Sequence, residues 1–134
     1  MWKFDISSLS PLLITGDILI LMAFMILGQL SHDMIPWKRP DRYLMGILPF
    51  FIGWIIAAPL IGAYSYDSLS SPINAAKYAA VAWFFADLLA MLIRGLPFMP
   101  GGVAISFFLV SYFIGAIMLV SWRVGLVGFG LINT

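Results

Sequence analysis

Four long apolar segments, separated by short polar or proline- and glycine-rich connections, make up most of this chain. They are expected at residues 12–30, 43–64, 75–93 and 103–122. A helix of about 20 apolar residues spans the hydrocarbon core of a bilayer, so each segment is long enough to cross it. Because 63% of the residues are hydrophobic and 10% are charged, too little polar surface remains for a fold in water. The sequence therefore predicts an all-α, polytopic membrane protein whose four transmembrane helices form one domain over residues 1–134.

The same composition removes several classes of function. Cysteine is absent, which excludes disulfides, thiolate metal sites and thiol catalysis. His32 is the single histidine, so the chain alone cannot build a multi-histidine metal site. A net charge of +1 offers no basic footprint for nucleic acid, and no triad or phosphate-binding loop pattern stands out. We therefore expect no enzymatic activity and no nucleic-acid partner, and the sequence leaves any cofactor unknown.

The distribution of cations predicts an orientation. The first and third connections carry four of them: Lys38, Arg39, Arg42 and Arg94. The other side of the membrane carries three: Lys3, Lys77 and Arg123. Because the cations at residues 38–42 form a compact cluster beside two helix ends, the positive-inside rule places the loop 31–42 in the cytoplasm. We expect a multi-pass protein of the plasma membrane, and the apolar tail 124–134 either extends the last helix or lies at the interface.

Asp17 interrupts the first apolar segment, and a carboxylate in hydrocarbon needs a cation, a proton or a water-filled cavity. In the predicted topology Asp17 shares its half of the membrane with Arg123, which makes a structural Asp17–Arg123 pair the leading interpretation. Two alternatives stay open. Asp17 faces a polar cavity as a proton or cation site, or it lies at the membrane interface.

Asp87 interrupts the third segment at greater depth. The end of that segment shares a side with His32 and Arg94, so a polar cluster of the three is one prediction. The alternatives are a buried hydrogen bond to a serine or tyrosine, or a neutral protonated acid. His32, next to a predicted helix end, is in addition a candidate pH-sensitive gate.

Small and aromatic residues mark the candidate packing faces. An alanine stripe with helical spacing lies on one face of the third segment: Ala75, Ala79, Ala82, Ala86 and Ala90. Small residues allow close helix contact in a membrane, so this face serves packing within the bundle or a homodimer interface. Trp54 and Trp83 either pack in the core or contact a ligand, quinone or pigment. Trp122, beside Arg123, is expected to anchor a helix end at the interface.

A series of landmarks in the chain resembles a known family, DUF3054, a family of membrane proteins without an assigned function. The landmarks are Gly16-Asp17, Gly28 with Ser31-His32, Pro49-Phe50, Gly53-Trp54, Ala58-Pro59, Gly62-Ala63-Tyr64, Trp83, Arg94, Phe108-Leu109-Val110 and Trp122-Arg123. The resemblance covers about residues 15–123 and implies about four membrane helices, without an established activity. Family members often carry arginine where this chain has Gln29.

These patterns favour a non-enzymatic membrane component that associates with itself or with a larger membrane complex and contacts lipid, quinone or pigment. Its alanine- and glycine-lined faces would make the contacts. The alternative is a proton-coupled small-molecule transporter that works as a homodimer through Asp17. A lipid-active enzyme with Asp87 and His32 as acid and base is a third, weaker hypothesis.

Overall fold

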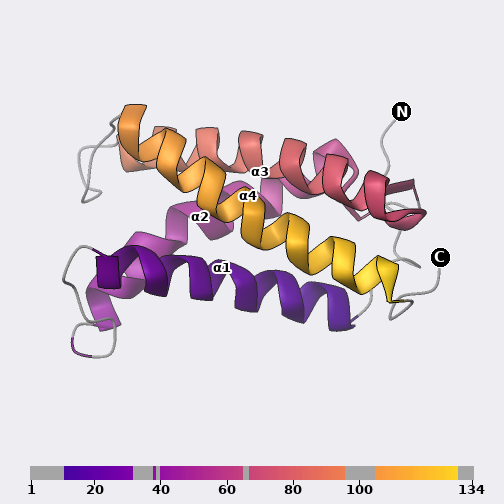
Figure 1. Ribbon diagram of the computed structural model, residues 1–134. Helices are drawn as coiled ribbons and strands as arrows, with labels where there is room; N and C mark the ends of the chain where they lie inside the picture. The colour runs from indigo at the N-terminus through magenta and orange to yellow at the C-terminus, as the bar shows by residue number, and fades with distance from the viewer. Residues whose placement is uncertain (1–10, 32–37, 39, 65–66, 96–104, 130–134) are drawn as a thin grey trace.

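The computed structural model describes residues 11–31, 38, 40–64, 67–95 and 105–129. Four α-helices fill these ranges: α1 (Pro11–Ser31), α2 (Pro40–Ile61), α3 (Pro72–Arg94) and α4 (Ile105–Gly128). A short 3-10 helix, η2 (Asp67–Leu69), precedes α3. Each α-helix is long and apolar enough to cross a membrane. The prediction of an all-α bundle with four transmembrane helices is confirmed (Figure 1).

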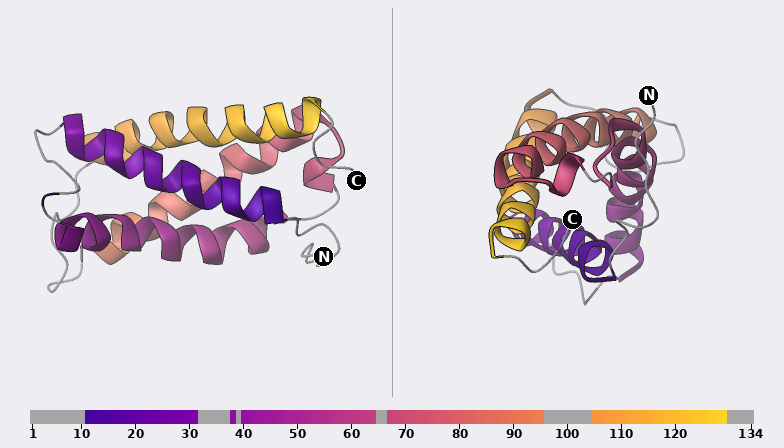
Figure 2. Two further views of the ribbon diagram at one scale, coloured as in Figure 1. Left: turned by 90° about the horizontal axis from the view of Figure 1, so that it is seen from below. Right: turned by 90° about the vertical axis from the view of Figure 1, so that its right-hand side faces the viewer.

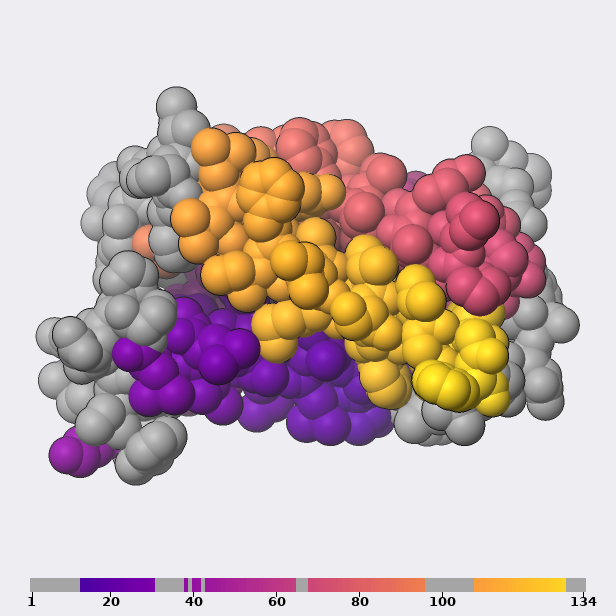
Figure 3. All heavy atoms as spheres, in the orientation of Figure 1, coloured from indigo at the N-terminus to yellow at the C-terminus, as the bar shows by residue number. Residues whose placement is uncertain are grey.

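The helices run antiparallel and stand at the corners of a square when the bundle is viewed along its axis (Figure 2). α3 packs closely against both α2 and α4, whereas α1 contacts the same two helices less extensively. On one face of the molecule α4 passes between α3 and α1 (Figure 3). We call the two ends of the bundle the Pro11 end, where α1 and α3 begin, and the Ser31 end, where α2 and α4 begin.

Local sequence explains where the helices begin and end. α1, α2 and α3 each begin with a proline, whose fixed φ and missing N–H suit the first helical position. Ser71 caps α3 by accepting a hydrogen bond from the Asn74 backbone. α2 ends at Ile61 and is followed by Gly62, which has a φ of 95°, a conformation that favours glycine. The turn at Gly62 directs the chain back over the Pro11 end of the bundle, with Ala63 and Tyr64 buried.

Several helix ends differ from the predicted approximate spans. α4 continues to Gly128 rather than ending at residue 122, so residues 124–128 extend the helix and 130–134 lie outside the described residues. α2 ends at Ile61 rather than residue 64, and it is continuous through Pro49 and Pro59. The apolar composition of both regions hides these boundaries, because it suits a longer or a shorter span equally well.

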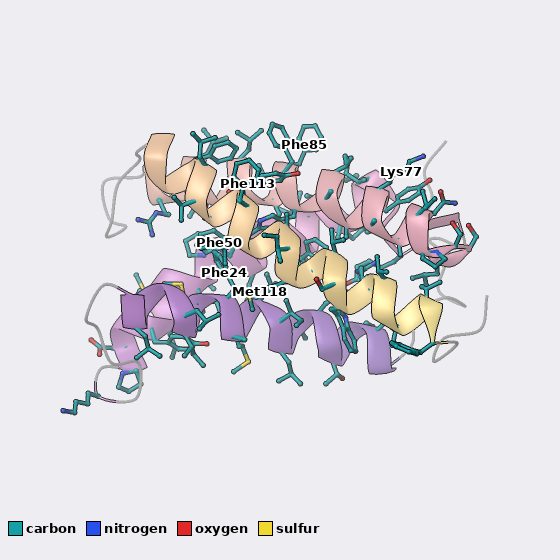
Figure 4. All side chains as sticks on the ribbon, in the orientation of Figure 1. Phe24, Phe50, Lys77, Phe85, Phe113 and Met118 are labelled. Atoms are coloured by element: carbon teal, nitrogen blue, oxygen red, sulfur yellow. The ribbon has the colours of Figure 1, made fainter. Side chains whose placement is uncertain are left out.

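An aromatic layer fills the middle of the bundle. The Phe24 ring meets Phe50 and Trp83 edge-on, at centroid distances of 5.1 and 5.3 Å, and Phe50 stacks on Trp83 at 5.8 Å. Figure 4 shows Phe24 and Phe50 directed between the helices. Such pairs contribute about 0.5–1.5 kcal/mol each beyond their burial. This layer separates the polar groups of the two ends of the bundle.

The alanine stripe of α3 is completely buried within the single chain. Next to Ala86, α2 contributes Gly53, whose Cα lies so close that an added Cβ would overlap the Ala86 carbonyl. Small residues on both helices permit this close contact. Packing within the bundle, the first of the two interpretations, is confirmed, and the use of this face as a homodimer interface is wrong.

Candidate functional site

Asp17 and Arg123 form a buried ion pair near the Pro11 end. Asp17 lies six residues into α1, about 9 Å along the helix axis. Its carboxylate accepts two hydrogen bonds from Arg123 of α4, from Nε at 3.2 Å and from the terminal guanidinium nitrogen at 2.6 Å. The side chains of Asp17 and Arg123 are 1% and 0% exposed. The predicted pair is confirmed, and its two-point geometry fixes the rotation of α1 relative to α4.

Three further groups enclose this pair. The Tyr64 hydroxyl donates to Asp17 at 2.6 Å and accepts from the Trp54 indole N–H at 3.0 Å. The remaining guanidinium nitrogen of Arg123 donates to the Ala63 carbonyl at 2.6 Å. The guanidinium also lies 5.5 Å from the centroid of the Trp54 ring and 5.0 Å from that of Tyr64. Every charged atom of the pair is therefore satisfied inside the protein.

Tyr64 acts as a hydrogen-bond donor to Asp17 throughout the physiological pH range. Burial raises its pKa above the ordinary value of 10.0, and the negative charge of Asp17 raises it further. Because the pKa in the fold is raised, ionisation of this hydroxyl opposes folding only above about pH 10, where an unfolded tyrosine loses its proton. The Asp17–Tyr64 bond is consequently a permanent part of the network at neutral pH.

The sequence predicts Trp122 as an interface anchor at a helix end, but the structure places it inside α4. Because α4 extends to Gly128, Trp122 is no longer at a helix end. Its ring lies over Gly16 of α1, where an added Cβ would overlap the indole. Gly16 thus allows α4 to approach α1 directly beside the Asp17–Arg123 pair.

Asp87 occupies a separate polar site in the half of the bundle nearer the Ser31 end. It is fully buried, and Ser111 of α4 lies 3.0 and 2.8 Å from its two carboxyl oxygens. The Ser111 hydroxyl also lies 3.0 Å from the Phe108 carbonyl in its own helix. Of the interpretations left open, the buried hydrogen bond to a serine is confirmed. Asp87 meets Ser111 rather than forming an ion pair with Arg94.

The other candidate residues take different places. Arg94 is half-buried in the last turn of α3, and His32 lies outside the described residues. Trp83 is buried in the aromatic layer and donates to the carbonyls of Ser111 and Tyr112, at 3.2 and 3.1 Å. Trp54 is buried against the Asp17–Arg123 pair. For both tryptophans the geometry favours core packing over contact with a ligand.

Two partners in these sites were missed by sequence reasoning. They are Tyr64, at the end of the predicted span 43–64, and Ser111, inside the predicted span 103–122. The sequence offered one signal for both: each is a polar residue within a predicted span or at its end, where a polar side chain needs a hydrogen-bond partner. Their pairing depends on the Gly62 turn and on the rotation of α4. Within the described ranges, no group of three His, Asp or Glu side chains forms a metal site.

Four antiparallel apolar helices held by a buried ion pair define the class: this is a small multi-pass integral membrane protein. The chain belongs to the family described as protein of unknown function (DUF3054), which it matches over residues 14–126. No curated protein and no solved structure matches the chain. The predicted resemblance to this family is thus confirmed. Gln29 is buried beside Gly46 of α2.

Proposed function

We propose that this protein is a non-enzymatic component of the plasma membrane that works by associating with a second copy of itself. The observation that carries the proposal is the contrast between its interior and its outer face. The Asp17–Arg123 pair is closed inside the bundle, whereas a cluster of aromatic side chains faces outward from α3 and α4. Polar groups that hold helices together, and apolar groups that face the membrane, suit a structural or assembly role.

The outward cluster, which we call the aromatic face, consists of the exposed Phe84, Phe85 and Phe113 together with Phe108 and Tyr112, which are partly buried against the core. The Phe84 ring meets Phe85, Phe108 and Tyr112 edge-on, with centroids 5.3 to 5.9 Å apart. Figure 4 shows Phe85 and Phe113 on the outer side of the bundle. Because these rings already order one another, a partner that packs on them loses little side-chain freedom. This favours the aromatic face over the buried alanine stripe as the contact surface.

Self-association is tested with purified protein in lipid nanodiscs and in mild detergent, by native mass spectrometry across a concentration series. We expect a dimer whose dissociation constant rises at least about tenfold, or about 1.4 kcal/mol, in the double variant Phe84→Ala/Phe113→Ala. The matched control is Ile55→Ala/Leu60→Ala, which shortens two exposed side chains on α2. A monomer at every concentration, or equal weakening by both double variants, would contradict the proposal. Co-purification of another membrane protein, a quinone or a pigment would assign the face to that partner instead.

The structure weakens the alternative of proton-coupled transport through Asp17. Both carboxylate oxygens of Asp17 are occupied by Arg123 and Tyr64. A cationic substrate would have to displace a guanidinium that is itself held by Ala63 and two aromatic rings. Transport would therefore begin with the loss of the contact that joins α1 to α4.

We infer that the Ser31 end of the bundle faces the cytoplasm. Arg123 pairs with Asp17 inside the bundle. It is therefore not a charge that flanks the membrane, and the positive-inside rule does not apply to it. Of the remaining cations, four belong to the first and third connections, which join helices at the Ser31 end: Lys38, Arg39, Arg42 and Arg94. Two cations, Lys3 and Lys77, belong by sequence order to the Pro11 end. The positive-inside rule then favours a cytoplasmic loop 31–42 more strongly than the sequence count did.

This orientation is tested with single cysteines, because the chain has none of its own. Lys38→Cys and Lys77→Cys place one thiol at each end of the bundle, both at exposed positions. In intact cells we expect a membrane-impermeant maleimide to label Lys77→Cys and to reach Lys38→Cys only after the cells are opened. The reverse pattern would invert the topology.

A further inference from the structure

The Asp87 site differs from the Asp17 site in the number of hydrogen-bond donors that it receives. Three donors reach Asp17: two from the Arg123 guanidinium and one from the Tyr64 hydroxyl. One side chain, Ser111, reaches both oxygens of Asp87. Both carboxyl groups are buried in the membrane-spanning part of the bundle, where a bare negative charge is costly. The Asp17 site is therefore arranged to stabilise a carboxylate, whereas the Asp87 site offers a negative charge little compensation.

Counting protons at Ser111 shows the difference. A serine hydroxyl carries one hydrogen, yet the Ser111 oxygen lies within 3.0 Å of three oxygens: both of Asp87 and the carbonyl of Phe108. If Asp87 is ionised, this one hydrogen must serve all three. If Asp87 carries a proton, its own O–H donates to Ser111, and Ser111 donates to Phe108. The protonated arrangement supplies one hydrogen between Asp87 and Ser111 and a second between Ser111 and Phe108, and it leaves no net charge at the site.

The groups around Asp87 supply no cation at hydrogen-bond distance within the described ranges. On its own helix, Arg94 follows seven residues later, about 10 Å along the axis toward the Ser31 end. Its guanidinium interacts electrostatically with Asp87, but the hydrogen bond of Asp87 is to Ser111. On α4, Tyr112 directs its hydroxyl to the Ala80 carbonyl, and Arg123 belongs to the Asp17 site. On α2, the hydroxyl of Tyr43 donates to Met22 of α1, and Asp41 stands at the exposed start of the helix.

The two polar sites do not connect through the middle of the bundle. Ser111 and Arg123 are twelve residues apart on α4, about 18 Å along the axis. The aromatic layer of Phe24, Phe50 and Trp83 lies between them, and Trp83 donates to the Ser111 carbonyl from the side of that layer. Within the described residues the aromatic layer therefore separates Asp87 from the Asp17 site, and Arg94 lies in the other direction, toward the Ser31 end.

We propose that Asp87 and Ser111 form a proton-binding site within the membrane, which exchanges one proton with the aqueous side at the Ser31 end. On binding, the proton joins one Asp87 oxygen and donates to Ser111; on release, it leaves to water and the carboxylate accepts from Ser111 instead. The contact between α3 and α4 thus changes its hydrogen-bond direction with pH. This inference does not depend on self-association.

The proposal is tested by infrared difference spectroscopy of the whole protein in nanodiscs, titrated with acid and base. We expect a C=O band of a protonated carboxylic acid at neutral pH, which shifts on transfer to D2O and is reversibly replaced by carboxylate bands as the pH rises. The band should disappear in Asp87→Asn and remain in Asp41→Asn, which removes an exposed carboxylate. Ser111→Ala should move it to higher frequency, because the acid loses its acceptor.

Three results would overturn the proposal. The first is the absence of a protonated carboxyl band at neutral pH, and the second is a band that survives in Asp87→Asn. The third is a band that persists to the alkaline limit of folding, since it would mark an acid that never releases its proton. If Asp87→Asn does not fold, Ser111→Ala decides the matter, and an unshifted band in that variant would reject the Asp87–Ser111 site.

Discussion

Replacing Arg123 with methionine is expected to destabilise the bundle by about 3–5 kcal/mol, because the Asp17 carboxylate remains buried without its cation. Asp17→Asn leaves the guanidinium uncompensated and should have a similar effect. The double variant Asp17→Asn/Arg123→Met removes both charges, so it should recover a large part of the lost stability. The measurement is folded yield by fluorescence-detected gel filtration, together with the thermal midpoint in nanodiscs of one lipid composition.

Two comparisons make this test specific. Lys77→Met removes an exposed cation at the same end of the bundle and should change stability little. Tyr64→Phe removes one donor from the network and should cost about 1–2 kcal/mol, less than loss of the ion pair. A charge exchange, Asp17→Arg/Arg123→Asp, should recover only part of the loss, since Ala63 and the Trp54 ring are arranged for a guanidinium on α4. Single variants as stable as Lys77→Met would show that the pair contributes nothing.

Gly53→Ala is expected to be the most damaging single-methyl change, at about 1–3 kcal/mol. The new methyl group would overlap the carbonyl and Cα of Ala86, and backbone atoms cannot move aside unless α2 and α3 separate. That separation would loosen the contact between α2 and α3. The matched control is Gly28→Ala in α1, where no heavy atom lies within 4 Å of the added Cβ. The control should keep or slightly raise stability, because alanine favours a helix more than glycine does.

The two substitutions are compared by thermal unfolding in the same nanodiscs. Gly115→Ala gives an intermediate case, because the methyl group there would overlap the Trp83 ring, a side chain rather than backbone. Equal midpoints for Gly53→Ala and Gly28→Ala would contradict this close packing, because the Ala86 backbone would then tolerate a methyl group at position 53.

The Asp17–Arg123 pair was predictable because topology alone assigns both residues to one half of the membrane. Its enclosure by Tyr64 and Trp54 was not predictable from spacing. Tyr64 reaches the pair through the turn at Gly62, whose positive φ no hydropathy pattern encodes. For Asp87 the sequence left a polar cluster, a serine bond and a protonated acid open together. The choice of Ser111 required the rotation of α4 about its axis.

The sequence by itself determined that this chain crosses a membrane four times, because apolar length and the cost of unpaired backbone in lipid allow few other solutions. It also indicated which face of α3 is small enough for close packing. Only the tertiary structure decided that this face is buried by packing within the chain, that α4 extends to Gly128, and that the two aspartates occupy separate sites. The physical reason is that hydropathy depends on composition, whereas pairing depends on helix rotation and turn geometry, which composition leaves undetermined.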